Sequence, residues 1–167
     1  MTTPVLVGDI THNFKTIALN CVPYPVASLV SYAKTKIQKP EKIDLQIYKY
    51  PNKIIDTAIK EEPPAVCFSN YMWNLDLSYG IAQRIKKRNP RTVVIFGGPN
   101  YPTNDEEQKR FLERFSAIDF YIYKEGEVAF AELMNILIAC DFDASLAKEN
   151  KLSGTHFLRA NEFFGGP

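Results

Sequence analysis

The stretch "VVIFGG", residues 93–98, decides the fold class of this chain. Four apolar residues without a polar interruption are typical of a strand that is covered on both faces, as in a parallel sheet. Gly97 and Gly98 then end the strand. A tight turn would explain the two missing side chains, and so would a ligand that lies close to the backbone. We expect an interior strand whose carboxyl end meets a ligand.

Apolar runs of the same kind alternate with helical patterns along the first 140 residues. The predicted strands cover residues 4–9, 42–50, 64–70, 92–98 and 117–123. The predicted helices cover residues 25–37, 53–62, 75–88, 105–115 and 127–139. This alternation predicts a three-layer α/β fold, Rossmann-like or flavodoxin-like, with a five-stranded parallel sheet between helices.

The polarity of each strand suggests its place in the sheet. The second and fifth strands, "IDLQIY" and "IDFYIY", alternate apolar and polar residues, which predicts an edge position or one wet face. The other three are continuously apolar, so the order 2-1-3-4-5 is expected. In that order ligands bind between the first and third strands, at their carboxyl ends. The loops that follow the strands there cover residues 8–24, 69–74 and 97–103.

Composition excludes several classes of partner. The 167 residues include 20 Lys and Arg against 19 Asp and Glu, a net charge of +1. We therefore expect no nucleic-acid partner and no attraction to anionic membranes. No apolar run approaches the length of a membrane span, and a cytoplasmic location is expected. The cysteines Cys21, Cys67 and Cys140 are too far apart for a metal site, and inert thiols are predicted.

Several side chains near the strand ends are candidates for ligand contact. Ser69 follows the third strand, and Tyr71 and Trp73 could form flat walls, although Ser69 and Asn74 could instead cap the next helix. In "KEGEVAF", Glu125 and Glu127 suit a helix start, or lie beside a ligand with Gly126. No nucleophile elbow, phosphate loop or metal-ligand run is present, which argues against a hydrolase.

Three stretches taken together resemble the amino-terminal cobalamin-binding domain of cobalamin-dependent radical S-adenosylmethionine enzymes. They read "AVCFSNYMWN", "VVIFGGPNYPT" and "AIDFYIYKEGEVAFAELMNIL". In that family the serine and the glycines line a groove for the nucleotide tail of cobalamin. The resemblance implies the following cofactor-binding residues: Ser69, Asn70, Tyr71, Gly97, Gly98, Pro99, Tyr101, Glu125, Gly126 and Glu127.

Two departures from related families bear on the chemistry. Corrinoid methyltransferases of the methionine synthase type place Asp-x-His-x-x-Gly after the first strand, with the histidine on cobalt. Here Asp9 and His12 are one residue too far apart and no glycine follows at the required position, so His12 is a minority candidate for a cobalt ligand. Lys124 also replaces the first glycine of the family's Gly-Glu-Gly-Glu motif.

The resemblance implies that cobalamin binding and catalysis belong to two different domains. Residues 1–140 would bind cobalamin, and residues 141–167, which look like a strand-turn-strand linker, would lead to a barrel. That downstream catalytic domain would hold the iron–sulfur cluster and S-adenosylmethionine, since the chain lacks the Cys-x-x-x-Cys-x-x-Cys motif. We therefore expect a fragment of a longer enzyme that is inactive alone, with methyl transfer among the reactions of its class.

The sequence is also compatible with two other functions. The domain could be a vestigial docking platform that no longer binds a corrinoid, with its groove filled by Tyr71, Tyr101 and the first long loop. A flavin-binding domain is the other reading. A phosphate-accepting receiver domain is disfavoured, because the third strand ends in Ser69 and Asn70 rather than in an acceptor aspartate.

Overall fold

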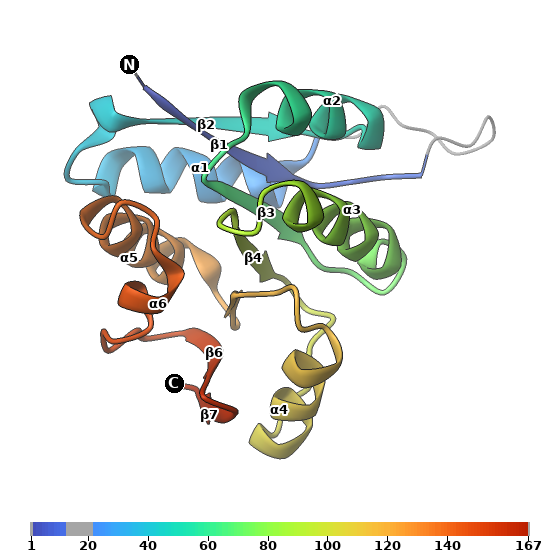
Figure 1. The fold of residues 1–167 in the computed structure, drawn as a ribbon, viewed down its shortest axis with the longest axis vertical. Helices are drawn as coiled ribbons and strands as arrows, with labels where there is room; N and C mark the ends of the chain where they lie inside the picture. Colours follow the sequence, from blue (N-terminus) through green and yellow to red (C-terminus); the bar gives the residue numbers. More distant parts are fainter. Residues whose placement is uncertain (1, 13–21, 167) are drawn as a thin grey trace.

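The computed structural model describes residues 2–12 and 22–166, and its centre is one seven-stranded sheet. Figure 1 shows how the elements are arranged. The strands are β1 (Thr3–Gly8), β2 (Ile43–Tyr48), β3 (Ala65–Ser69), β4 (Val93–Gly97), β5 (Phe120–Ile122), β6 (Thr155–Arg159) and β7 (Glu162–Phe164). The helices are α1 (Tyr24–Lys36), the short 3-10 helix η1 (Pro40–Lys42), α2 (Pro51–Glu61), α3 (Leu75–Arg88), α4 (Asp105–Arg114), α5 (Gly126–Ala139) and α6 (Ala144–Ala147).

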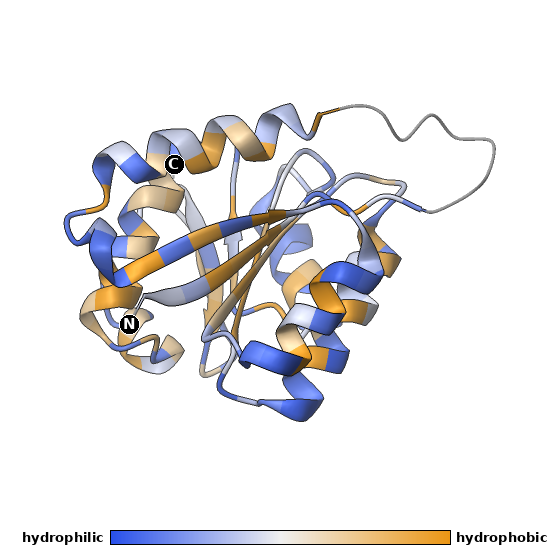
Figure 2. Cartoon of the chain, turned by 90° about the horizontal axis from the view of Figure 1, so that it is seen from above, coloured by the Kyte–Doolittle hydropathy of each residue, from blue (hydrophilic) through white to orange (hydrophobic). Residues whose placement is uncertain are grey.

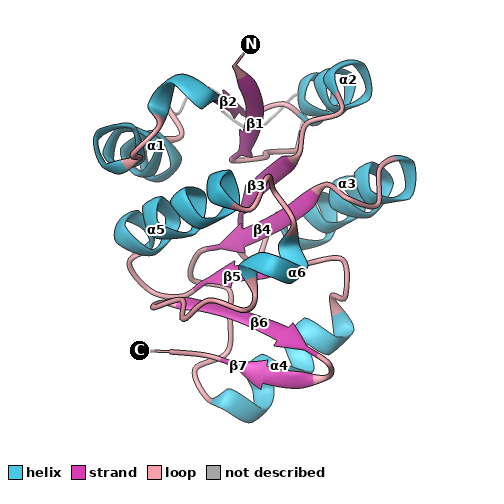
Figure 3. Cartoon of the chain, turned by 60° about the vertical axis from the view of Figure 1, so that its left-hand side comes forward, coloured by secondary structure: helices cyan, strands magenta, loops and turns pink. Residues whose placement is uncertain are grey.

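Helices cover both faces of the sheet and create two separate cores. Figure 3 shows α1 and α5 on one side of the strands and α2 and α3 on the other. Alternate residues of each interior strand serve the two cores. On β4, Val93 and Ile95 pack toward α1 and α5, whereas Val94 and Phe96 pack toward α2, α3 and α4. Figure 2 accordingly shows apolar strands at the centre and helices with one polar face. The uninterrupted "VVIF" run is thus explained by burial on both faces.

The predicted order of the first five strands is confirmed, but the prediction of a five-stranded sheet is wrong. The order is β2-β1-β3-β4-β5-β6-β7, with β1 to β5 parallel. β6 pairs with β5 in the antiparallel direction, with Tyr121 opposite His156. The turn from β6 to β7 uses Ala160 and Asn161, both at positive φ, as tight hairpins of two residues require.

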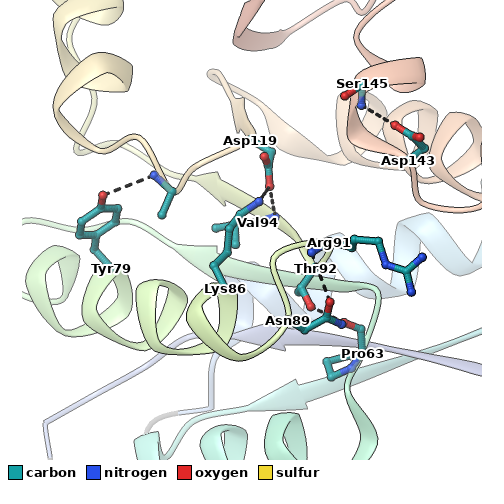
Figure 4. Close-up of polar contacts among 11 residues, drawn as sticks. Pro63, Tyr79, Lys86, Asn89, Arg91, Thr92, Val94, Asp119, Asp143 and Ser145 are labelled. Atoms are coloured by element: carbon teal, nitrogen blue, oxygen red, sulfur yellow. Dashed lines mark hydrogen bonds and ion pairs between the residues drawn. The ribbon is translucent and has the colours of Figure 1, made fainter.

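The fifth strand is therefore interior, although its alternation suggested an edge. Phe120, Tyr121 and Ile122 are all buried, because β6 continues the sheet beyond them. Asp119, the polar residue just before them, lies at the amino-terminal edge of the sheet, the edge opposite the carboxyl ends of the parallel strands. Figure 4 shows that it contacts Lys86 and Val94 there. Its Oδ2 accepts hydrogen bonds from the Val94 backbone N–H and from Lys86 Nζ, both at 2.7 Å. Asp119 is therefore polar because it forms an ion pair at the start of β5, and not because one face of the strand is exposed to solvent.

The carboxyl ends of the central parallel strands lie level with one another. Ser69 on β3 is opposite Gly97 on β4, and Gly97 is in turn opposite Ile122 on β5. The chain leaves β1 for β2 in one direction and enters β3 on the other side of β1, which makes the switch point predicted from the sequence. Within the described residues, no helix combines the length and apolar character needed to cross a membrane.

Candidate functional site

A cavity of about 640 Å³ lies at the carboxyl ends of β1, β3, β4 and β5. This volume is in the range of pockets that bind small molecules, roughly 300–1,000 Å³. Its floor, formed by the lining residues of β1, β3, β4 and β5, is mostly apolar, whereas its rim, formed mainly by the loops that follow these strands, carries most of the polar and charged side chains. The lining residues outside the predicted set are Val7, Pro25, Val26, Leu29, Cys67, Phe68, Ile95, Phe96, Thr103, Ile122, Tyr123, Lys124 and Phe130.

Nine of the ten residues predicted to contact a cofactor line this one cavity. They are Ser69, Tyr71, Gly97, Gly98, Pro99, Tyr101, Glu125, Gly126 and Glu127. The tenth, Asn70, is fully buried behind the strand ends. Its Nδ2 donates to the carbonyl oxygen of Asn100 at 2.7 Å and to the hydroxyl of Tyr121 at 2.9 Å. Asn70 thus supports the wall of the cavity from outside it.

The two glycines after β4 are explained by the approach of the protein's own backbone. Gly98 has φ +127°, and a Cβ placed on it would lie 2.7 Å from the carbonyl oxygen of Asn70. A Cβ on Gly97 would lie 3.2 Å from the Cβ of Ile122. Close packing of β3, β4 and β5 therefore requires a glycine at 98 and favours one at 97 before any ligand is considered. Both residues still line the cavity, so a ligand there would meet bare backbone.

A small polar network fixes the loops that follow β1 and β3. The Ser69 hydroxyl donates to Asp9 Oδ1 at 2.5 Å, so it bridges the two strands at the switch point. Asn74 is buried, and its Oδ1 accepts from the Tyr71 backbone N–H at 2.8 Å. Asn74 stands at the N-cap position of α3 without a side-chain cap bond. Asn74 thus fixes the conformation of the loop that carries Tyr71. The ring of Tyr71 stacks on the ring of Trp73, with the two centroids 4.6 Å apart.

An aromatic wall closes the cavity on the side of α4 and β6. Tyr101 stacks on Tyr121, and His156 packs beside Tyr123 with ring centroids 4.7 Å apart. Burial raises the pKa of Tyr101 and of Tyr121 well above the ordinary range, so both phenols stay protonated. Burial likewise raises the pKa of the Cys67 thiol, as expected for an inert cysteine. Cys21 lies outside the described residues.

The start of α1 forms a part of the site that sequence reasoning missed. Pro25, Val26 and Leu29 face the cavity from its first turns. The apolar stripe of this helix was visible in the sequence, but a stripe alone does not separate residues that face a cavity from residues that face the core. Gly126 lets α1 approach α5 here, because a Cβ on it would lie 3.2 Å from Leu29 Cδ1.

The segment between β5 and α5 carries the charges of the rim. Lys124 has φ +58°, in the left-handed region, and its Nζ lies 5.0 Å from the centroid of the Tyr123 ring. Glu125 is the N-cap residue of α5 but makes no side-chain cap bond, and Glu127 lies in the first turn. Lys124 thus stands at a position whose backbone favours glycine.

His12 does not line the cavity. Its exposed ring lies over the loop after β3, with Nε2 3.0 Å from the carbonyl oxygen of Trp73. In residues 2–12 and 22–166, no group of three or more His, Cys, Asp or Glu side chains could hold a metal ion. The central part of the predicted first loop, residues 13–21, lies outside the described residues.

Sequence comparison assigns the family. The family described as "B12 binding domain" matches residues 13–134, most of the chain. The chain belongs to this B12-binding family. A cobalamin-dependent radical SAM methyltransferase, TokK of Streptomyces tokunonensis, is 36% identical to this B12-binding domain over 73 residues. That match covers 44% of this chain and 10% of TokK.

A second relative matches more of the B12-binding domain. The 2-(S-pantetheinyl)-carbapenam-3-carboxylate methyltransferase of Streptantibioticus cattleyicolor is 31% identical over 127 residues. The match covers 71% of this chain and 18% of that enzyme. The chain thus spans less than a fifth of the length of either curated relative.

A solved structure has the same fold over nearly the whole chain. It is the cobalamin-dependent S-adenosylmethionine radical enzyme OxsB with aqua-cobalamin and S-adenosylmethionine bound. The TM-score is 0.69 at 16% identity, and the alignment covers 99% of this chain and 22% of OxsB. The likeness extends beyond residue 134, where the family match ends, and so includes β6 and β7.

Proposed function

We propose that this chain is the cobalamin-binding module of a radical S-adenosylmethionine enzyme, with methyl transfer as its reaction. The observation that carries the proposal is the position of the cavity. In a chain of the B12-binding family, it lies at the carboxyl ends of the parallel strands and beside the switch point. Ligands of open α/β sheets bind at this place.

The lining residues fit a cobalamin in two parts. The apolar floor, with the bare backbone of Gly97 and Gly98, would accept the nucleotide tail at the level of the sheet. The corrin ring is too large for the same space and would lie across the rim, near Tyr71 and the start of α1. Bound cobalamin would supply the cobalt centre, and the chain would hold and orient it and exclude water from the tail.

The radical chemistry is assigned to a separate domain. The three cysteines of the chain are 46 and 73 positions apart (67 − 21 and 140 − 67), so they cannot form the three-cysteine motif that binds an iron–sulfur cluster. We propose that the β6–β7 hairpin leads toward a catalytic domain with that cluster and S-adenosylmethionine. The share of the curated relatives that this chain spans supports this arrangement.

A docking platform without a corrinoid is less well supported. That function would be favoured if Tyr71, Tyr101 and the first long loop filled the groove; residues 13–21 of this loop lie outside the described residues. Both side chains instead stand in the wall of a cavity of about 640 Å³, Tyr71 stacked on Trp73 and Tyr101 on Tyr121. Space for a ligand therefore remains between them.

Binding of cobalamin to the isolated chain tests the proposal. Hydroxocobalamin should co-elute with the protein, change its visible spectrum and raise the midpoint of thermal unfolding in a concentration-dependent way. A Thr103→Trp variant should bind several-fold more weakly, because Thr103 is exposed at the cavity mouth. Lys87→Trp is the matched control, since Lys87 is exposed on α3 away from the cavity. Absence of binding at high micromolar cobalamin would contradict the proposal.

A further inference from the structure

We propose that Lys124 binds the phosphodiester of the cobalamin nucleotide tail and makes the site selective for corrinoids that carry this tail. The inference rests on the proposed function and adds a specificity-determining residue to it. Its basis is a charged side chain at the cavity rim, on a backbone that would be more stable with glycine.

The backbone at Lys124 explains why glycine would be the least costly residue there. The Tyr123 N–H still donates to the Gly154 carbonyl at 2.8 Å, and α5 begins at Gly126. The chain must reverse between these points, and it does so with Lys124 at φ +58°. A side chain in this region costs about 1 kcal/mol relative to glycine. A strained position in the lining of a cavity is a reason to look for function.

Lys124 is a charged residue of the cavity lining. Its Nζ is 5.0 Å from the centroid of the ring of Tyr123, another lining residue, and this contact attracts the ammonium toward the ring. Lys124 is the one lysine or arginine among the described lining residues. None of the ion pairs found in residues 2–12 and 22–166 includes it, so the ammonium has no fixed carboxylate partner there.

The position of Lys124 in the cavity indicates which part of a bound cobalamin it would contact. Lys124 lies two residues after Ile122, which pairs with Gly97, and it lines the same cavity as Gly97 and Gly98. These two glycines border the space assigned to the nucleotide tail. The phosphodiester is the permanent anion of a cobalamin, whereas the amide arms of its corrin ring are neutral. An ammonium at this point therefore distinguishes a corrinoid with a tail from one without it.

A comparison of two corrinoids isolates the contact. Dicyanocobalamin and dicyanocobinamide share their axial ligands, but the second lacks the nucleotide tail and its phosphodiester. Wild-type protein should prefer dicyanocobalamin. Lys124→Ala should weaken dicyanocobalamin binding about five-fold, the effect of an exposed ion pair of ~1 kcal/mol, and leave dicyanocobinamide binding unchanged. Lys124→Arg should retain the preference, and Lys87→Ala, which changes an exposed lysine of α3 that does not line the cavity, should not alter it.

The outcomes separate the two proposals. If wild-type protein binds neither corrinoid, the proposed function fails, and this inference with it. If it binds both, but Lys124→Ala weakens both equally or neither, the inference alone is overturned.

Lys124→Gly provides a second test that a structural role would not satisfy. The variant should unfold at a higher temperature, because the strain is removed, and should still lose the preference for dicyanocobalamin. Between about 0.05 and 0.5 M salt, the wild-type preference should also shrink, since salt screens exposed charges. A more stable variant with an unchanged ratio of the two affinities would contradict the inference.

Discussion

The rings of Tyr101 and Tyr121 stack with their centroids 3.7 Å apart and their planes within 10°, but their hydroxyl groups differ in hydrogen bonding. The Tyr121 hydroxyl donates to the Gly98 carbonyl at 2.8 Å and accepts from Asn70. The buried Tyr101 hydroxyl has no hydrogen-bond partner among the described residues. The hydroxyl of Tyr121 is thus fully hydrogen-bonded, whereas that of Tyr101 is buried without a partner among the described residues.

Tyr101→Phe should therefore stabilise the protein. Removal of a buried hydroxyl without a partner should raise the free energy of unfolding by about 1 kcal/mol. Tyr121→Phe is the matched control and should lower it by about 1–2 kcal/mol, because Asn70 and Gly98 lose a partner. Urea denaturation of the three proteins measures both effects. Equal losses in the two variants would show that the Tyr101 hydroxyl is bonded after all.

Gly98→Ala should be among the most damaging single changes at the cavity. The added methyl group would meet the Asn70 carbonyl at 2.7 Å on a backbone with φ +127°, at a cost of about 3 kcal/mol. In Gly97→Ala the added methyl group would lie 3.2 Å from the Cβ of Ile122, a less severe contact, and the free energy of unfolding should fall by about 1 kcal/mol. Gly80→Ala should stabilise by about 1 kcal/mol, since Gly80 lies in α3 and an added Cβ meets nothing within 4 Å. A Gly98→Ala protein as stable as wild type would contradict the close approach.

Stability should fall as the pH is lowered through the range in which histidine titrates. Burial lowers the pKa of His156 below its ordinary value of about 6.5, and the Gly166 carbonyl and Asp105 offset this only in part. The unfolded chain then binds more protons than the folded one below about pH 6.5, so the free energy of unfolding decreases there and is fully retained above it. Urea midpoints at about pH 5.5 and pH 7.5 measure the change.

His156→Phe is the control for this effect. A phenyl ring suits the aromatic surroundings of Tyr123 and Phe163 and cannot take up a proton. The variant should show a smaller loss of stability at the lower pH. The interpretation fails if its pH dependence equals that of wild type.

Asn70→Ala should destabilise the wall of the cavity. The change removes the bonds from Nδ2 to Asn100 and Tyr121 and the bond that Oδ1 accepts from Asn100 Nδ2, at a cost of about 3 kcal/mol. Asn100→Ala removes only the last of these side-chain bonds and should cost about 1 kcal/mol. Thermal unfolding of both variants gives the comparison, and an Asn70→Ala loss no larger than that of Asn100→Ala would argue against the network.

The order of the first five strands could be predicted because burial on two faces leaves a direct mark in the sequence. "VLV", "AVCF" and "VVIF" could only be interior strands, and their carboxyl ends then had to meet at one edge. The position of β5 could not be derived in this way. Asp119 and Tyr121 are polar in type, yet one forms an ion pair and the other a buried hydrogen bond, so alternation did not mean exposure.

The cavity residues that follow the strands could be predicted from the sequence, but those that α1 contributes could not. Side chains that directly follow a parallel strand must face the carboxyl edge, which is why most of the predicted residues line the cavity. Pro25 and Leu29 join it only because α1 packs against Gly126, a contact between segments almost 100 positions apart. The two glycines suggested a ligand in the sequence, but the backbone of Asn70 and the side chain of Ile122 already leave little room for a Cβ at these positions.

The antiparallel pairing of β6 with β5 has a practical consequence for anyone who shortens this protein. A truncation after α5 would leave the backbone of Tyr121 and Ile122 without its neighbour and uncover one side of the aromatic wall. Strands with an open, apolar edge recruit other strands, so such a product would tend to aggregate. Expression trials that aim at a minimal corrinoid carrier should keep the hairpin through Phe164.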